Sequence, residues 1–122
     1  MISPSQNWTV RLGASAETDI EEILRWTLAQ FGEAQTRIYA ETISLALMSL
    51  AGGPNIIGSR TRDDIGKRIS TLHIARNGRS GRHFVLYRVA KHRQSRVIEV
   101  LRLLHDAMDL ARHVPTSDEE QK

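Results

Sequence analysis

The most informative part of this chain is RVIEVLRLLHDAMDLARHVP, residues Arg96–Pro115. Its apolar run from Val97 to Leu104 is rich in leucine and β-branched residues, which is typical of a strand buried on both faces. Asp106 can cap a final helical turn, and Pro115 ends that turn. The apolar side chains of the turn are Met108, Leu110, Ala111 and Val114. The stretch therefore predicts a buried strand followed directly by a short helix.

The length and composition of the chain fit one small domain. It has 122 residues, of which 40% are apolar, and no apolar run that approaches the ~20 residues of a membrane span. The N-terminal residues show no secretory signal, and the absence of cysteine excludes disulfides and thiolate metal ligands. We expect a single cytoplasmic domain over residues 8–115, with a flexible segment 1–7 before it and a disordered polar tail 116–122 after it.

Charge is distributed unevenly along the chain. Residues 54–96 hold 11 basic and 2 acidic side chains, whereas each flanking segment carries a net charge of −3. Arginine accounts for 14 of the 17 basic residues, and its guanidinium can pair with carboxylates through two hydrogen bonds. This excess indicates an acidic partner, either a protein or a nucleic acid, although arginines that only solubilise the strands are the alternative.

The first half of the chain predicts a strand and two helices. Trp8–Leu12 alternates apolar and polar residues, as a half-buried strand does. Ser15 can cap a first helix, whose apolar face extends to Phe31 and which ends at Gly32. A second helix, residues 33–50, follows and is stopped by an Ala-Gly-Gly-Pro sequence. Because almost no linker separates the two helices, they should form an antiparallel hairpin.

The second half predicts most of the sheet. Residues 55–67 have no clear hydrophobic period and read as a long loop. Three strands joined by connectors of hairpin length follow it, at about Arg68–Arg76, Arg82–Ala90 and Arg96–His105. The resulting order is β-α-α-β-β-β-α, an α+β fold in which a helical hairpin packs on a mainly antiparallel sheet.

Three motifs in this order resemble the ParE/RelE superfamily of bacterial toxins. The sequence SAETDIEEI after the first strand is a helical opening typical of the superfamily, and the pair Tyr87-Arg88 matches its recurrent YR pair. The apolar strand that leads into Leu104-His105 and then Met108-Asp109 is the most specific motif, and it resembles the ParE family. Ala107 departs from the pattern, since the family often has an arginine at that place. The resemblance covers about Trp8 to Pro115.

The resemblance implies one of two functions. ParE-like members are toxins of type II toxin–antitoxin modules that inhibit DNA gyrase by binding and are neutralised by an antitoxin, usually ParD-like. RelE-like members are ribosome-dependent mRNA endonucleases. We expect the ParE-like function: a protein that is not an enzyme, uses no cofactor, forms a hetero-oligomer with its antitoxin and meets DNA only through that antitoxin. A nuclease, or a non-toxic homologue that only binds the antitoxin, is the alternative.

The nuclease alternative names candidate catalytic residues. Cleavage through the 2′-hydroxyl needs proton carriers and cations that stabilise the phosphorane. The candidates are His83, Tyr87, Arg88 and His105. His83 and Tyr87 share one face of their strand while Arg88 points to the other, so the strand does not favour this set. The five histidines are scattered along the sequence, and no metal site is expected.

The resemblance to ParE instead implies residues that contact an antitoxin and gyrase. Arginines along the strands could receive the acidic segment of an antitoxin, and these are Arg68, Arg76, Arg82, Arg88 and Arg96. The C-terminal segment combines a flexible apolar side chain with charged neighbours, as interface hot spots often do. Its candidate gyrase contacts are His105, Met108, Asp109, Arg112 and His113.

Overall fold

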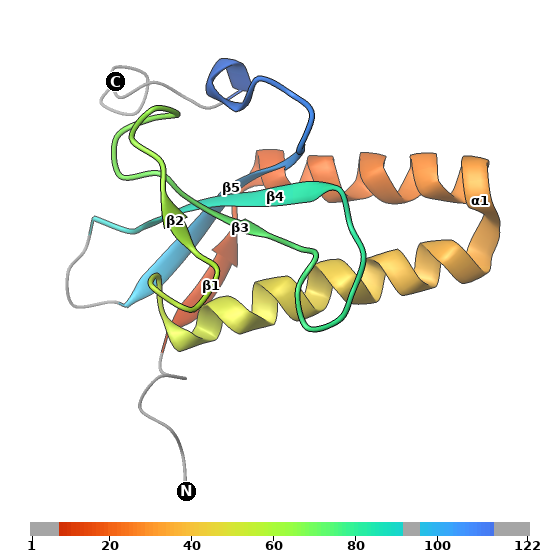
Figure 1. The fold of residues 1–122 in the computed structure, drawn as a ribbon, viewed down its shortest axis with the longest axis horizontal. Coiled ribbons are helices and arrows are strands. Elements are labelled where there is room, and N and C mark those ends of the chain that lie inside the picture. The colour runs from red at the N-terminus through yellow and green to blue at the C-terminus, as the bar shows by residue number, and fades with distance from the viewer. Residues whose placement is uncertain (1–7, 92–95, 114–122) are drawn as a thin grey trace, which may run out of the picture.

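The computed structural model describes residues 8–91 and 96–113 (Figure 1). Along the chain lie β1 (Thr9–Leu12), α1 (Ala14–Ser49), the 3-10 helix η2 (Leu50–Gly52), β2 (Arg60–Thr61), β3 (Ser70–His73), β4 (His83–Val89), β5 (Val97–His105) and the 3-10 helix η3 (Leu110–His113). The strands form one sheet in the order β1-β5-β4-β3-β2, in which β1 is parallel to β5 and the other pairs are antiparallel. The predicted α+β fold is confirmed. The segments expected to be flexible or disordered, 1–7 and 116–122, lie outside the described residues.

The long helix α1 is the predicted helical hairpin. Gly32 has φ 87 and ψ 180, which breaks the helix into a first arm (residues 14–31) and a second arm (residues 33–49). Glycine takes this conformation without the steric cost that a Cβ would bring. The bend between the arms lies well beyond the strands in Figure 1, so the hairpin projects past one end of the sheet. The predicted cap was wrong, because the N-cap is Gly13 in an extended conformation and not Ser15.

The inner strand β5 is buried from both sides, as its sequence predicts. Toward the helices, Ile98 and Val100 are fully buried among α1, β3 and β4. Toward the opposite face, Leu104 joins a smaller cluster with Ile65, Ile69, Leu86 and Leu110. A β-bulge next to Leu86 shifts the pairing of β5 with β4, which changes the alternation so that Leu103 faces the helices and Leu104 faces away.

Three local predictions were wrong. The loop expected over residues 55–67 contains the two-residue strand β2, which is too short to show a period. The strand expected to start at Arg68 starts at Ser70, because Arg68 itself has a left-handed φ of 62. The final turn is a 3-10 helix that begins at Leu110, and Asp106 does not cap it. Asp106 instead accepts hydrogen bonds from His73 and Arg82.

In the described part of the chain, no helix combines the length and apolar character that crossing a bilayer requires.

Candidate functional site

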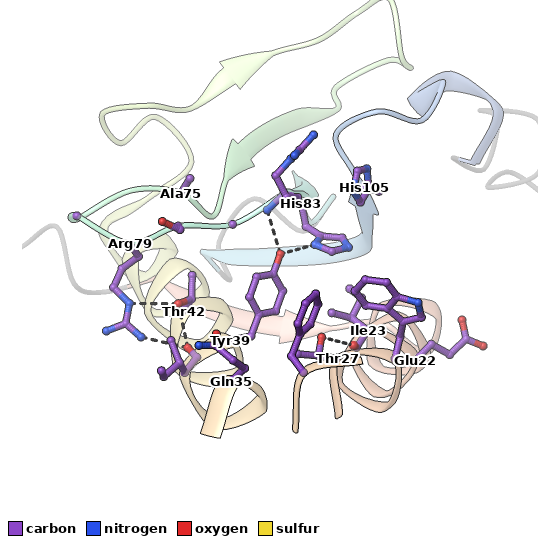
Figure 2. Close-up of a pocket in the computed structure, with 17 residues that line it drawn as sticks. Glu22, Ile23, Thr27, Gln35, Tyr39, Thr42, Ala75, Arg79, His83 and His105 are labelled. Atoms are coloured by element: carbon purple, nitrogen blue, oxygen red, sulfur yellow. Dashed lines mark hydrogen bonds between the residues drawn. The ribbon is translucent and has the colours of Figure 1, made fainter. Parts of the chain in front are cut away.

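An open groove of about 1520 Å³ lies where the projecting hairpin meets the sheet (Figure 2). Both arms of α1, the connection between β3 and β4, and the end of β5 contribute to its walls. Three large apolar side chains on the walls stay exposed, Trp26 at 59%, Phe31 at 62% and Ile38 at 50%. The rings of Trp26 and Phe31 meet edge to face at 5.7 Å. Exposed apolar side chains gathered in one groove are typical of a contact site for another molecule.

The floor of the groove is a hydrogen-bonded pair of Tyr39 and His83. The Tyr39 hydroxyl accepts the backbone N–H of Arg82 at 3.0 Å and lies 2.6 Å from Nδ1 of His83. Figure 2 shows the Tyr39 ring rising from the second arm toward the histidine. Burial, assisted by nearby His105, lowers the pKa of His83 to about 4, and burial raises the pKa of Tyr39. Both groups are therefore uncharged at neutral pH.

His105 lies beside His83 on the neighbouring strand. The two residues are paired in the register of β4 and β5, and their ring centroids are 5.3 Å apart at 80°. Nδ1 of His105 accepts the backbone N–H of Ala107 at 3.1 Å, which fixes the orientation of the ring. The groove thus contains two imidazoles, one half-buried and one more open to solvent.

Ion pairs fix the cations around the groove. The guanidinium of Arg79 donates to Oγ1 of Thr42 at 3.1 Å, and it pairs with Glu41 at 2.8 Å. These contacts fasten the β3–β4 connection to the second arm. At the same end of the sheet, the carboxylate of Asp106 accepts hydrogen bonds from Nε2 of His73 at 3.0 Å and from Nε of Arg82 at 3.3 Å. The hydrogen bond from His73, with Arg82 nearby, lowers the pKa of Asp106.

Comparison with known proteins identifies the family of this chain. The family model described as "ParE toxin of type II toxin-antitoxin system, parDE" matches residues 10–110. The chain belongs to the ParE toxin family. A solved structure described as "Chromosomal ParDE TA system from P. aeruginosa" has a similar fold, with a TM-score of 0.66, 16% sequence identity, and coverage of 82% of this chain and 97% of that one. Among curated proteins, no sequence matches this chain.

The structure does not assemble the nuclease candidates into one site. His83 and His105 lie together in the groove, as described above. Tyr87 is fully buried, and its hydroxyl donates to the carbonyl of Pro54 at 2.9 Å. Arg88 lies on the opposite face of the sheet, where its Nε is 3.1 Å from Glu99. Two of the four predicted residues are therefore separated from the groove of this ParE-family chain. Within the described ranges, no three histidine, aspartate or glutamate side chains are placed to hold a metal ion.

The five arginines predicted to bind an antitoxin do not form one surface. Arg82 lines the groove and is paired with Asp106, and Arg88 is on the far face. Arg76 is half-buried and donates to the carbonyl of Ile57 at 3.0 Å. Arg68 and Arg96 flank the strands at the other end of the sheet, away from the groove. The structure therefore distributes these five side chains over several parts of the sheet, and their contact with an antitoxin stays a prediction.

The predicted gyrase contacts are divided between the groove and the C-terminal segment. His105 lines the groove, and Met108 beyond it is 40% exposed. The exposed pair Asp109–Arg112 is 3.6 Å apart, while Leu110 between them is buried. The segment is thus anchored by Leu110 and exposes Met108, Asp109 and Arg112 to solvent. The side chain of His113 lies outside what the structure describes.

Four groove residues were not predicted as site residues. Phe31 was expected on the core face of the first helix. Tyr39 was expected in the apolar stripe of the second helix. Trp26 and Arg79 carry no local signal of their role. Tyr39 offered the best available clue, because a phenol that enters a core needs a hydrogen-bond partner.

Proposed function

We propose that this ParE-family protein acts by binding: it inhibits DNA gyrase, and a ParD-like antitoxin neutralises it by placing an amphipathic segment in the groove. The observation that supports this best is the groove itself, with three large apolar side chains exposed along an uncharged floor. An antitoxin segment that is disordered alone can fold as it covers such a surface.

The groove defines the chemistry of the antitoxin segment. Its wall on the second arm extends from Gln35 to Thr42, and the wall on the first arm extends from Glu22 to Phe31. Ten helical residues span about 15 Å, so the groove offers room for about three turns of a bound helix. The neutral floor of Tyr39 and His83 favours apolar or uncharged side chains there. Because Arg79 is already paired, we expect apolar contacts to contribute most of the affinity.

The proposed gyrase contact adjoins the groove. Met108 and Arg112 are exposed, and Leu110 fastens their segment to the sheet. His105, three residues before Met108, lines the groove itself. An antitoxin seated beside His105 would therefore obstruct the C-terminal segment, which gives neutralisation a simple steric basis.

A supercoiling assay tests the gyrase proposal. Purified protein should inhibit DNA supercoiling by gyrase, and Met108→Ala combined with Arg112→Ala should reduce the inhibition by roughly 10-fold, as loss of an interface hot spot does. Met48→Ala is the matched control, because Met48 is 68% exposed on the second arm and should be neutral. Inhibition by wild-type protein that is unchanged in the double variant would locate the gyrase contact elsewhere.

One observation favours the nuclease as the second candidate. The imidazoles of His83 and His105, 5.3 Å apart in an open groove, could serve as a proton donor and acceptor. A translating ribosome assay separates the two functions. The binding proposal expects intact mRNA, whereas cleavage that His83→Ala or His105→Ala abolishes would establish the nuclease. If gyrase and mRNA are both unaffected while the antitoxin still binds, the protein is a non-toxic homologue.

A further inference from the structure

The end of the sheet away from the groove gathers four exposed cations, Lys67, Arg68, Lys91 and Arg96, called here the basic end. They come from three chain segments that the strands bring together. Nη1 of Arg68 donates to the carbonyl of Val89 at 3.4 Å, which places it beside the end of β4. The backbone N–H of Ala90 donates to the carbonyl of Val97 at 2.8 Å. Lys91 follows Ala90 and Arg96 precedes Val97, so both cations flank this hydrogen-bonded pair.

Within the described ranges, none of these four side chains forms an ion pair. Other cations of the same basic segment do: Arg62 with Asp64 at 2.8 Å, Arg79 with Glu41 at 2.8 Å, and Arg82 with Asp106 at 3.3 Å. The connection between β2 and β3, which holds Lys67 and Arg68, also carries the exposed Asp63, and the four cations still exceed this acid in charge. A concentration of unpaired positive charge attracts an anionic partner over several ångströms.

Backbone strain marks the same place. Arg68 has φ 62 and Arg96 has φ 46, and Asn77 is the third described residue other than glycine with a positive φ. A positive φ is unfavourable for a residue that has a Cβ, and glycine would adopt it more easily. Strained residues are often kept where their side chains serve a function. Here the strain falls on two exposed arginines that form no ion pair in the described structure.

We propose that the basic end binds the phosphate backbone of duplex nucleic acid, without reading its bases. Single strands are held chiefly by stacking on exposed aromatic rings. Trp8, which precedes β1 beside Arg96, packs its ring against Gly53 and the core instead. The large exposed groove side chains, which suit a protein partner, lie at the other end of the sheet. Flexible, exposed cations of this kind suit phosphates best.

This site is independent of the proposed groove contact. An antitoxin seated between the arms of α1 would leave the basic end uncovered, so toxin and complex should both bind a duplex. The toxin would thus contact nucleic acid directly, whereas the family resemblance implies contact with DNA only through the antitoxin.

Fluorescence anisotropy of the full chain with labelled duplexes tests the proposal. Random-sequence duplexes of DNA and of RNA are compared with single-stranded DNA. Four phosphate contacts predict a slope of about −3.6 in log affinity against log salt, or a loss of roughly 100-fold between about 50 and 200 mM salt. Binding of either duplex supports the proposal, and the tighter one identifies the source of the phosphates.

Variants separate charge from folding. Arg68→Gly with Arg96→Gly should lower the salt slope by about 2 while the Tm holds or rises, because glycine relieves the positive φ. Lys67→Ala with Lys91→Ala, at positions without a positive φ, should lower the slope equally. Arg25→Ala with Arg37→Ala is the matched control on the hairpin and should change nothing. Tighter binding to single strands, no duplex binding, or full duplex affinity in both test variants would overturn the proposal.

Discussion

The two ends of the sheet use the same strands for opposite chemistry. At the groove end, the cations Arg79 and Arg82 are paired with carboxylates, and the histidine on the floor is neutral. At the basic end, Arg68 and Arg96 are exposed and form no ion pair in the described ranges. The excess positive charge of residues 54–96 therefore does not lie on one surface. Part of it fastens loops to the fold, and only the unpaired part is free to attract a ligand.

The difference between the groove and the basic end predicts that binding at the two sites responds differently to salt. Contacts in the groove are mainly apolar, so their affinity should depend weakly on salt. Contacts at the basic end are purely electrostatic and should weaken steeply as salt rises. The following changes test this contrast, beginning with the largest expected effect.

Val100→Asp should abolish both sites by unfolding the domain. Val100 is fully buried in β5, between the helices and the sheet, and β5 joins the two ends. An unpaired buried carboxylate costs several kcal/mol, which is comparable with the ~5–15 kcal/mol stability of a small domain. Circular dichroism should show no cooperative melt. Met48→Asp, at a position 68% exposed, is the control and should melt like the wild type. A cooperative melt of Val100→Asp would contradict the buried position of β5.

Asp19→Ala should destabilise the domain by loosening the first arm of α1 from β5. The carboxylate of Asp19 accepts Nε of Arg102 at 2.7 Å and the backbone N–H of Leu103 at 2.9 Å, which holds the first arm on β5. Removing one member of a buried pair costs about 3 kcal/mol, because its partners lose their acceptor. Chemical denaturation measures the loss, with Glu21→Ala on the exposed side of the same arm as the control. Equal stabilities of the two variants would show that the pair contributes little.

The sequence predicted the elements that depend on local patterns. The apolar run of β5 indicated burial on both faces, and Gly32 with almost no linker indicated the hairpin. Failures occurred where distant residues decide. Asp106 has the sequence of a helix cap, yet it is recruited by His73, which is 33 positions away. Phe31 has the spacing of a core residue, but the hairpin projects past the sheet and leaves the ring 62% exposed.

The site was less predictable than the fold for the same reason. The floor of the groove joins Tyr39 and His83 across 44 positions, so no local spacing could reveal it. The charge excess was visible in the sequence, but its division into paired and unpaired arginines depends on where carboxylates such as Glu41 come to lie. Composition therefore indicated an anionic partner without locating it.

Trp26→Ala with Phe31→Ala should weaken antitoxin binding by roughly 10–100-fold, since exposed aromatic side chains dominate such interfaces. The Tm should change little, because the two side chains are 59% and 62% exposed. Leu28→Ala is the control: Leu28 is 48% exposed on the same arm but does not line the groove. Calorimetric titration at two salt concentrations gives both affinity and salt dependence. If duplex affinity falls along with antitoxin affinity, the two ends are not independent.

The smallest expected effect concerns pH. His83 has a pKa of about 4 in the folded protein, against an ordinary value of 6.5. Between these values the unfolded chain binds a proton that the folded protein does not, so stability falls as pH drops from about 6.5 to 4. The full shift corresponds to roughly 3 kcal/mol, and partial exposure of the ring reduces this to ~1 kcal/mol. The Tm of wild type and of His83→Gln, measured across this range, should converge at low pH. Tyr39→Phe should keep most of the wild-type slope, because burial and not the hydroxyl is the main cause of the shift. A slope that disappears in Tyr39→Phe but survives in His83→Gln would assign the pH response to another group.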